Sequence, residues 1–208
     1  MTTKQAAAPK SKTGLIIGLV GGGIVLLLVL AVVLGTNEVG AEFGDPQIEG
    51  AGLPLMPPQN PIDETANGLA IPNVTGQNFD GNTVTIDRGD GRAKAIVLLA
   101  HWCSHCQAEV PRVQAYLNQT GGVDTVDMYS VATSMNSAQG NYPPSDWLDR
   151  EGWTVPVIRD DKENSVLSAY GSGGFPYWVF VNSDGTVALR TAGELTTEQL
   201  DGILRSLG

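Results

Sequence analysis

The feature that most constrains this chain is a short cluster of cysteine and histidine side chains behind a continuous apolar run. Residues 101–106, His-Trp-Cys-Ser-His-Cys, contain both cysteines and both histidines of the 208-residue sequence. The preceding residues 95–100 are all apolar, which is typical of a buried strand. After the cluster, Val110, Val113 and Leu117 recur at helical spacing. The cluster is therefore expected where a buried strand turns into a helix.

Two cysteines three positions apart at the start of a helix favour a particular chemistry. The free N–H groups and the positive end of the helix dipole favour a thiolate at Cys103. Cys106 follows one turn later, close enough to close a small disulfide with Cys103. So short a loop stabilises a fold very little, because it removes little entropy from the unfolded chain. The pair therefore predicts redox chemistry, in an oxidising compartment where no thiol is left over.

The N-terminal segment has the pattern of a membrane anchor. Three lysines (Lys4, Lys10 and Lys12) precede a long uncharged run, and no acidic residue occurs before Glu38. About twenty helical residues span the roughly 30 Å of a bilayer's hydrocarbon core. We therefore expect a basic tail followed by a membrane helix, with the boundaries 1–13 for the tail and 14–35 for the transmembrane helix.

The flanking charges predict the orientation of this segment. The next basic residue after the lysines is Arg88, so the N-terminus is expected to be cytoplasmic and the rest extracytoplasmic, on a single-pass protein of the cell membrane. A cleaved signal peptide is the alternative, because residues 39–41, Val-Gly-Ala, suit a cleavage site. The apolar run exceeds the roughly 7–15 residues of a signal peptide's apolar region, so we favour the uncleaved anchor.

The remainder of the chain is strongly acidic. Without the three N-terminal lysines it carries 9 basic and 22 acidic residues. Such a surface disfavours both nucleic acid and anionic lipid headgroups. We therefore expect no nucleic-acid partner, and contact with the lipid bilayer only through residues 14–35.

Between the anchor and the cluster, residues 36–67 are expected to form an acidic, Pro- and Gly-rich linker. They contain five prolines and six acidic residues without one basic residue, and they show no sustained helix or strand period. This composition is typical of extended spacers. A folded domain is then expected over residues 68–208, a length that can bury a core without metals or extra disulfides.

Within residues 68–208, turn signals and periodicity predict strands that alternate with helices. The expected elements are a hairpin over 78–86, the strand and helix around the cluster with a stop at Gly121, a strand over 126–133, short helices over 145–150 and 161–170, a hairpin over 177–191 and a last helix capped at Thr196. Ser145 is the expected cap of the first short helix. This order indicates an α/β layer sandwich with a mixed sheet.

Three motifs resemble those of a known family. Residues 102–106 resemble the W-C-x-x-C of the thioredoxin fold, and residues 174–176, Gly-Phe-Pro, resemble its cis-proline segment. Residues 106–111, Cys-Gln-Ala-Glu-Val-Pro, are similar to the C-x-x-E-x-P of membrane-anchored TlpA/ResA-like proteins, whose D-G-K-x-V hairpin resembles residues 80–84. The resemblance implies a thioredoxin-like three-layer sandwich and a thiol-disulfide oxidoreductase without a cofactor.

The resemblance also implies roles for individual residues. Cys103 would form a mixed disulfide with a partner, and Cys106 would resolve it. Glu109 would be a partly buried carboxylate that takes the proton of the resolving thiol, unless it is an ordinary surface glutamate. Pro176, in a cis peptide bond, would expose the backbone of Phe175 to an extended substrate. The expected partners are cysteine-containing exported proteins and a membrane or extracytoplasmic electron donor or acceptor.

Three neighbouring side chains are less specific. Trp102 is expected to shield the disulfide and contact the substrate. His105 is expected to favour the Cys103 thiolate, which would make the disulfide more oxidising, or else to be a solvated residue at a helix start. His101 either tunes the site or faces solvent. The direction of electron transfer stays open, because His105 favours an oxidase or isomerase while the run around Glu109 resembles reductases.

Other functions are less well supported by the cluster. Its four ligating side chains within six residues suit a metal ion, but a strand-to-helix turn would point them in different directions. A copper-delivery module would show C-x-x-x-C with a distant histidine, and a thiol peroxidase would show P-x-x-x-T-x-x-C. The sequence contains neither pattern. We therefore expect no metal ligands here. A Cys/His metal-binding or copper-delivery module, a thiol peroxidase of the peroxiredoxin branch and a purely structural cysteine pair stay open as alternatives.

Overall fold

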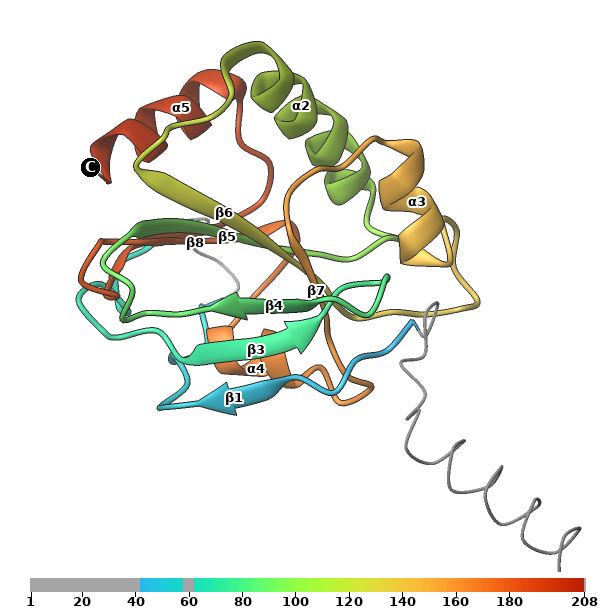
Figure 1. Cartoon of the computed structure of the whole chain (residues 1–208), viewed down its shortest axis with the longest axis horizontal. Helices are drawn as coiled ribbons and strands as arrows, with labels where there is room; N and C mark the ends of the chain where they lie inside the picture. The colour runs from blue at the N-terminus through green and yellow to red at the C-terminus, as the bar shows by residue number, and fades with distance from the viewer. Residues whose placement is uncertain (1–41, 58–61, 208) are drawn as a thin grey trace, which may run out of the picture. The chain divides into compact units, whose positions relative to one another are not determined.

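The structure is a computed structural model, and it describes residues 42–57 and 62–207. These residues form a three-stranded sheet in the order β1-β3-β4 and a six-stranded sheet in the order β2-β9-β8-β5-β6-β7 (Figure 1). The strands are β1 (Gln47–Glu49), β2 (Ile62–Asp63), β3 (Asn73–Gln77), β4 (Thr83–Ile86), β5 (Ala93–Leu99), β6 (Val126–Ala132), β7 (Val157–Arg159), β8 (Tyr177–Val181) and β9 (Val187–Ala192). The helices are α2 (Ser104–Thr120), α3 (Pro144–Arg150), α4 (Ser165–Tyr170) and α5 (Thr197–Ser206).

Strand β5 is the centre of the six-stranded sheet, and each of its 7 residues is buried. It runs parallel to β6 and antiparallel to β8, so the sheet is mixed, as predicted. Alternate side chains of a strand point to opposite faces. Accordingly Ala95, Val97 and Leu99 join one hydrophobic core, while Ile96 and Leu98 join the other. Each fully buried aliphatic side chain contributes about 1.5–3 kcal/mol to the stability of the fold. Burial on both faces therefore holds β5 in the middle of the sheet.

The two hydrophobic cores separate three layers. Helices α2, α3 and α5 lie on one face of the six-stranded sheet, and β3, β4 and α4 lie on the other face (Figure 1). Their buried side chains join one core on each face. The expected hairpin is present as β3 and β4, which pair antiparallel, but its first strand lies before the predicted start at residue 78. The structure therefore confirms the three-layer α/β sandwich with a mixed sheet.

The strand-to-helix turn predicted at the cysteine cluster is present. Helix α2 begins at Ser104, and Cys103 at its N-cap has an extended backbone. The helix ends at Gly121, which has a left-handed φ of 75° and donates its N–H to the carbonyl oxygen of Leu117. Glycine adopts this conformation without the steric cost that a side chain brings. The predicted stop at Gly121 is thereby confirmed.

The predicted helix caps hold at one helix and fail at another. Ser145 is not the cap of α3, because the helix begins at Pro144 and Pro143 is its N-cap. Proline suits the first helical turn, where its fixed φ is helical and its missing N–H is not needed. At α5, Thr196 accepts the N–H of Gln199, whose side chain accepts the N–H of Thr196 in return. This reciprocal capping box confirms the second prediction.

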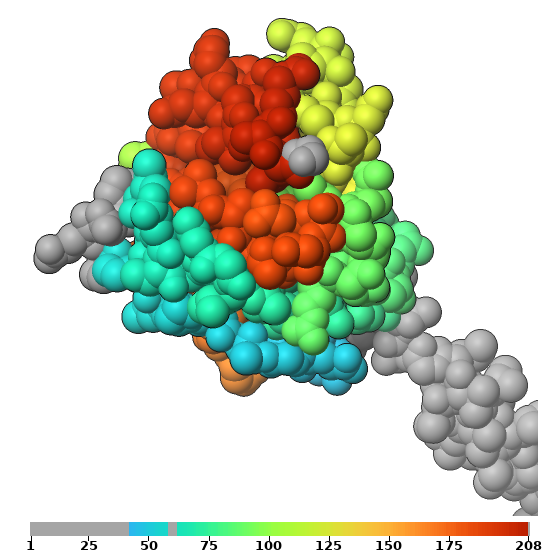
Figure 2. All heavy atoms as spheres, turned by 90° about the vertical axis from the view of Figure 1, so that its left-hand side faces the viewer, coloured from blue at the N-terminus to red at the C-terminus, as the bar shows by residue number. Residues whose placement is uncertain are grey.

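The prediction of an extended linker over residues 36–67 is wrong wherever the structure describes this segment. Strand β1 pairs with β3, and Leu53 and Met56 are buried in the core beneath β3 and β4. Strand β2 pairs with β9, and Asp63 forms a buried ion pair with Arg190. Figure 2 shows the turquoise atoms of the residues from 62 onward beside orange atoms of the C-terminal part. The local sequence shows no helix or strand period here because these residues are stabilised by pairing with strands that are distant in the sequence.

The predicted basic tail over residues 1–13 and transmembrane helix over residues 14–35 lie outside the described residues. In the part of the chain that the structure does describe, no helix combines the length and the apolar character needed to cross a membrane. The anchor therefore stays a prediction from the sequence.

Replacing Asp63 should destabilise the domain. Arg190 Nε donates to Asp63 Oδ2 at 2.7 Å, and both side chains are buried. Asp63→Asn leaves the guanidinium buried without its counter-charge, so we expect a loss of about 3–5 kcal/mol in the free energy of unfolding. Glu64→Gln, at an exposed neighbouring position, is the matched control and should change it by less than about 0.5 kcal/mol. Equal urea midpoints for the two variants would contradict a structural role for this segment.

Candidate active site

The two cysteines lie at the junction of β5 and α2, where the sequence predicts them. Cys103 is half-buried, and Cys106 in the first turn of α2 is completely buried. Both are free thiols. The fold therefore leaves one sulfur partly accessible and encloses the other in the core.

Burial raises the pKa of the Cys106 thiol well above its usual value. The proximity of Cys103 and the negative charge of Glu109 raise this pKa further, while a backbone hydrogen bond at Ala100 acts in the opposite direction. Cys106 is therefore a neutral thiol at rest. Because the thiolate is the reactive form, Cys106 needs a nearby base before it can attack another sulfur.

The segment that precedes β8 faces Cys103. The Cys103 Sγ donates to the carbonyl oxygen of Phe175 at 3.8 Å, and the Phe175–Pro176 peptide bond is cis. Phe175 is 72 positions away from the cysteine in the sequence. Pro176 thus occupies the place opposite Cys103 that the family resemblance implies.

Trp102 forms part of the surface beside the half-buried thiol. Its ring meets the ring of Phe175 edge to face, with centroids 6.0 Å apart, and its Nε1 donates to the carbonyl oxygen of Ser134 at 2.7 Å. The residue is 39% exposed, which leaves its indole available to an incoming molecule. Trp102 also lines a surface pocket of about 550 Å³ together with Phe43 and Tyr142.

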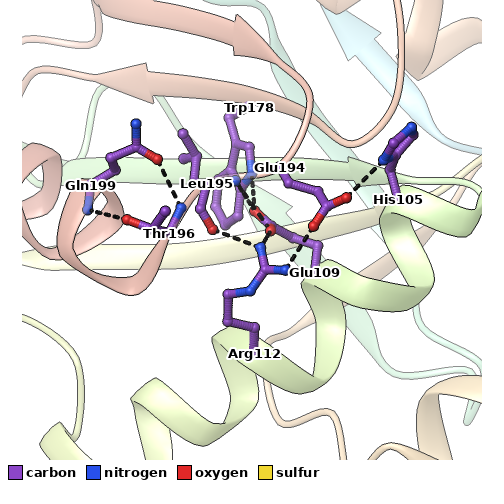
Figure 3. A network of polar contacts seen from close by, with 8 residues as sticks. All are labelled: His105, Glu109, Arg112, Trp178, Glu194, Leu195, Thr196 and Gln199. Carbon is purple, nitrogen blue, oxygen red and sulfur yellow. Dashed lines mark hydrogen bonds and ion pairs between the residues drawn. The ribbon is translucent and has the colours of Figure 1, made fainter.

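Glu109 lies in the core although it carries a carboxyl group. Trp178 Nε1 donates to Glu109 Oε1 at 3.0 Å, and the N–H of Leu195 donates to both carboxylate oxygens at 3.2 Å (Figure 3). Burial raises the pKa of Glu109, while these donors and Arg112 favour its ionised form. An ordinary surface glutamate is therefore the wrong interpretation, and the carboxylate is more deeply buried than the sequence predicts.

His105 lies in the first turn of α2 with an exposed side chain. Its Nδ1 is 2.7 Å from Oε1 of Glu194, and Figure 3 shows the ring directed at this carboxylate. Any electrostatic effect of His105 on the Cys103 thiol is therefore partly offset by the negative charge of Glu194. The sequence prediction for His105 did not include such a partner.

Arg112 and Glu194 are functional residues that the sequence patterns do not single out. Arg112 stands three residues after Glu109 on α2, and such an i,i+3 charge pair is a signal that a sequence can show. Glu194 lies in the connection between β9 and α5, 89 positions after His105. No local pattern in the sequence links Glu194 to His105, because only the fold brings these two residues together.

His101 is fully buried and is held by a loop. Its Nε2 accepts the N–H of Asn136 at 3.1 Å, and its Nδ1 donates to the carbonyl oxygen of Gly140 at 2.8 Å, in the tautomer that these partners require. Burial lowers the pKa of His101, which favours this neutral ring. Both ring nitrogens are occupied, so His101 is not a ligand of the alternative metal cluster. Among the described residues, no three His, Cys, Asp or Glu side chains are grouped to hold a metal ion.

Fold and site together define a class of protein. A mixed sheet inside three layers, two thiols at the first turn of a helix and a cis-proline segment facing the first thiol are the features of a thioredoxin-fold thiol-disulfide oxidoreductase. The chain belongs to the Redoxin family, whose model matches residues 66–204.

Individual relatives agree with this assignment. The chain is 23% identical over 146 residues to the thiol-disulfide oxidoreductase ResA of Bacillus thuringiensis (strain Al Hakam), a match that covers 67% of this chain and 78% of that protein. It shares its fold with a DsbF homologue from Corynebacterium diphtheriae (TM-score 0.59, 17% identity, 76% of this chain and 100% of the other). StoA from Bacillus subtilis also has this fold (TM-score 0.51, 18% identity, 68% and 98%). The ResA-like resemblance is thereby confirmed.

The two thiols should differ strongly in reactivity. In the folded, reduced protein we expect iodoacetamide to modify Cys103 at least about tenfold faster than Cys106, because burial opposes formation of the Cys106 thiolate. The variants Cys103→Ser and Cys106→Ser isolate each thiol, and intact-protein mass follows the reaction. The same pair in urea is the control, where both thiols should react alike. Equal rates in the folded protein would contradict the assignment.

Proposed function

We propose that this protein reduces disulfide bonds of exported, cysteine-containing proteins through Cys103 and Cys106. The observation that carries the proposal is the asymmetry of the two thiols. Cys103 is half-buried beside the carbonyl oxygen of Phe175, whereas Cys106 is enclosed and has a raised pKa. One sulfur is therefore accessible to a partner, and the second reacts with the first.

The proposed reaction consists of two exchange steps. First, the Cys103 thiolate attacks one sulfur of the partner's disulfide, which forms a mixed disulfide and releases the partner's other sulfur as a thiolate. Second, the Cys106 thiolate attacks the Cys103 sulfur, which closes the Cys103–Cys106 disulfide and releases the partner's remaining thiolate. The partner thereby gains two electrons and two protons, and the two cysteines lose them.

Glu109 is the proposed proton acceptor for the second step. Its negative charge already acts on the Cys106 thiol, and burial raises its own pKa. A raised pKa makes a carboxylate a stronger base at neutral pH, which suits it to receive the proton that Cys106 loses. In the reverse reaction the protonated Glu109 returns this proton.

The contacts of His105 favour the reducing direction. A positive charge beside Cys103 would stabilise the thiolate and hence make the disulfide more oxidising. The Glu194 carboxylate, 2.7 Å from the ring, supplies the opposite charge and offsets this effect. We therefore assign the protein to the reductases and not to the oxidases or isomerases.

Phe175 and Trp102 are the proposed contacts for the partner polypeptide. The Phe175 backbone borders Cys103 through its carbonyl group, and the Trp102 ring is partly exposed next to the Phe175 ring. An extended segment lying along Phe175 and Pro176 would bring its own sulfur to Cys103. Residues 14–35 are proposed to tether the whole domain to the outer face of the cell membrane, where such partners occur.

The reduction potential tests both the function and its direction. We expect the Cys103–Cys106 pair, equilibrated with glutathione buffers and analysed by alkylation and mass, to titrate near the roughly −270 mV of thioredoxin and not near the roughly −120 mV of strong oxidants. Cys103→Ser, which leaves a single thiol, is the control and should form no internal disulfide. A value near −120 mV would refute the reducing direction, and the absence of a Cys103–Cys106 disulfide at any poise would refute the function.

The proposed tether has its own test. The full-length protein should remain in the membrane fraction after an alkaline carbonate wash, whereas a variant that lacks residues 1–35 should appear in the supernatant, because a single apolar helix anchors it. A membrane-impermeant maleimide added to intact cells should label Cys103 in the full-length protein. Release by carbonate, or labelling only after the membrane is broken, would contradict the proposed tether or orientation.

A further inference from the structure

The guanidinium group of Arg112 joins two carboxylates that serve different parts of the site. Its Nη1 donates to Oε2 of Glu109 at 3.0 Å and to the carbonyl oxygen of Leu195 at 2.9 Å. Its Nη2 donates to Oε2 of Glu194 at 2.7 Å (Figure 3). Arg112 therefore contacts the buried proton acceptor and an acidic residue at the surface at the same time.

Glu194 extends this chain of contacts to the histidine between the cysteines. Its Oε1 lies 2.7 Å from Nδ1 of His105, while its Oε2 accepts from Arg112. The hydrogen bonds with His105, which has the larger effect, and with Arg112 hold the pKa of Glu194 below its usual value. Its carboxylate is therefore ionised. Four side chains, from His105 through Glu194 and Arg112 to Glu109, thus form one continuous polar path between the surface and the core.

The connection between β9 and α5 holds this path in place. Leu195 donates its N–H to Glu109 and accepts from Arg112 through its carbonyl group. The next residue, Thr196, is fixed by its capping box with Gln199 on α5 (Figure 3). Leu195 and Thr196, which follow Glu194, are both held by these hydrogen bonds and therefore set the position of Glu194. Its contact with His105 is thus part of the fold.

We propose that Arg112 and Glu194 are positioning residues that set the reactivity of the two thiols separately. Arg112 holds Glu109 in place and favours the ionised form that can accept the proton of Cys106. Glu194 holds a negative charge against His105 in the first turn of α2 and so slows the attack of Cys103 on a partner's disulfide. This inference rests on the proposed function, because it assigns control of the two exchange steps to two residues that touch neither sulfur.

A single assay separates the two steps. When the reduced full-length protein in detergent reacts with the aromatic disulfide DTNB, Cys103 attacks it, forms a mixed disulfide and releases one thionitrobenzoate. Cys106 then attacks the Cys103 sulfur, closes the internal disulfide and releases the second thionitrobenzoate. The first phase of release reports on Cys103, and the second phase reports on Cys106 and its base.

Glu194→Gln removes the charge and keeps the side-chain shape. The first phase should accelerate by about two- to fivefold, and the equilibrium with glutathione should shift by a similar factor toward the dithiol, because a nearby negative charge is gone. Glu49→Gln removes one charge at an exposed position on β1 and is the matched control. If Glu194→Gln and Glu49→Gln behave alike, the role assigned to Glu194 is refuted.

Arg112→Gln should act on the second phase in a pH-dependent way. The charged or titratable groups that face Glu109 are Arg112 and Cys106 on α2 and Glu194 on the β9–α5 connection. Loss of the cation favours protonated Glu109, so the second phase at about pH 6 should slow by roughly three- to tenfold and recover at higher pH. Arg205→Gln, a surface arginine paired with a carboxylate on α5, is the matched control.

The conservative variant Arg112→Lys distinguishes positioning from a merely structural role. It keeps the positive charge and should restore part of the second phase at about pH 6. A structural role alone predicts slower release at every pH in both Arg112 variants, together with a lower unfolding temperature, and that result would overturn the proposal. If the wild-type protein releases only one thionitrobenzoate, the proposed function fails first, which keeps the two failures distinguishable.

Discussion

The burial of β5 on both faces is the constraint on which the rest of the structure depends. All of its residues are enclosed, and β6 and β8 pair with it on either side, so the end of the strand has a fixed position. The chain turns there at once, and the N–H of Cys103 donates to the carbonyl oxygen of Ala100. Cys103 therefore closely follows a strand that is paired on both sides and buried on both faces. The direction of α2, which begins at the next residue, follows from the core that Val110 and Val113 enter.

A carboxylate in the core imposes the second constraint. An isolated buried charge is unfavourable, so Glu109 requires hydrogen-bond donors that replace water. Trp178 on β8, Leu195 after β9 and Arg112 on α2 provide them. Because these donors come from three parts of the fold, the group that is proposed to accept a proton also joins those parts. The requirements of chemistry and of packing therefore meet in the same side chain.

The sequence predicts those features that depend on neighbouring residues. The buried strand, α2 with its stop at Gly121 and the capping box at Thr196 all follow from local patterns. The cysteines and Glu109 were found by motif. Residues 42–57 and 62–67 do not read as folded from the sequence because their stabilising contacts, such as the pair of Asp63 with Arg190, join positions far apart in the chain. The Glu194 contact was missed for the same reason, since no local pattern encodes a pair 89 positions apart.

The segment that would contact a partner begins the β8–β9 hairpin, which also contacts Glu109, the group proposed to accept a proton. Pro176, opposite Cys103, accepts the N–H of Gly193 through its carbonyl oxygen at 2.9 Å, and Glu194 is the next residue. Two residues after Pro176, Trp178 donates to Glu109. A polypeptide lying against this segment would therefore contact backbone that is continuous with Glu194 in the polar path and with Trp178, which donates to Glu109. The proposed docking and the proposed proton transfer therefore both depend on the hairpin of β8 and β9.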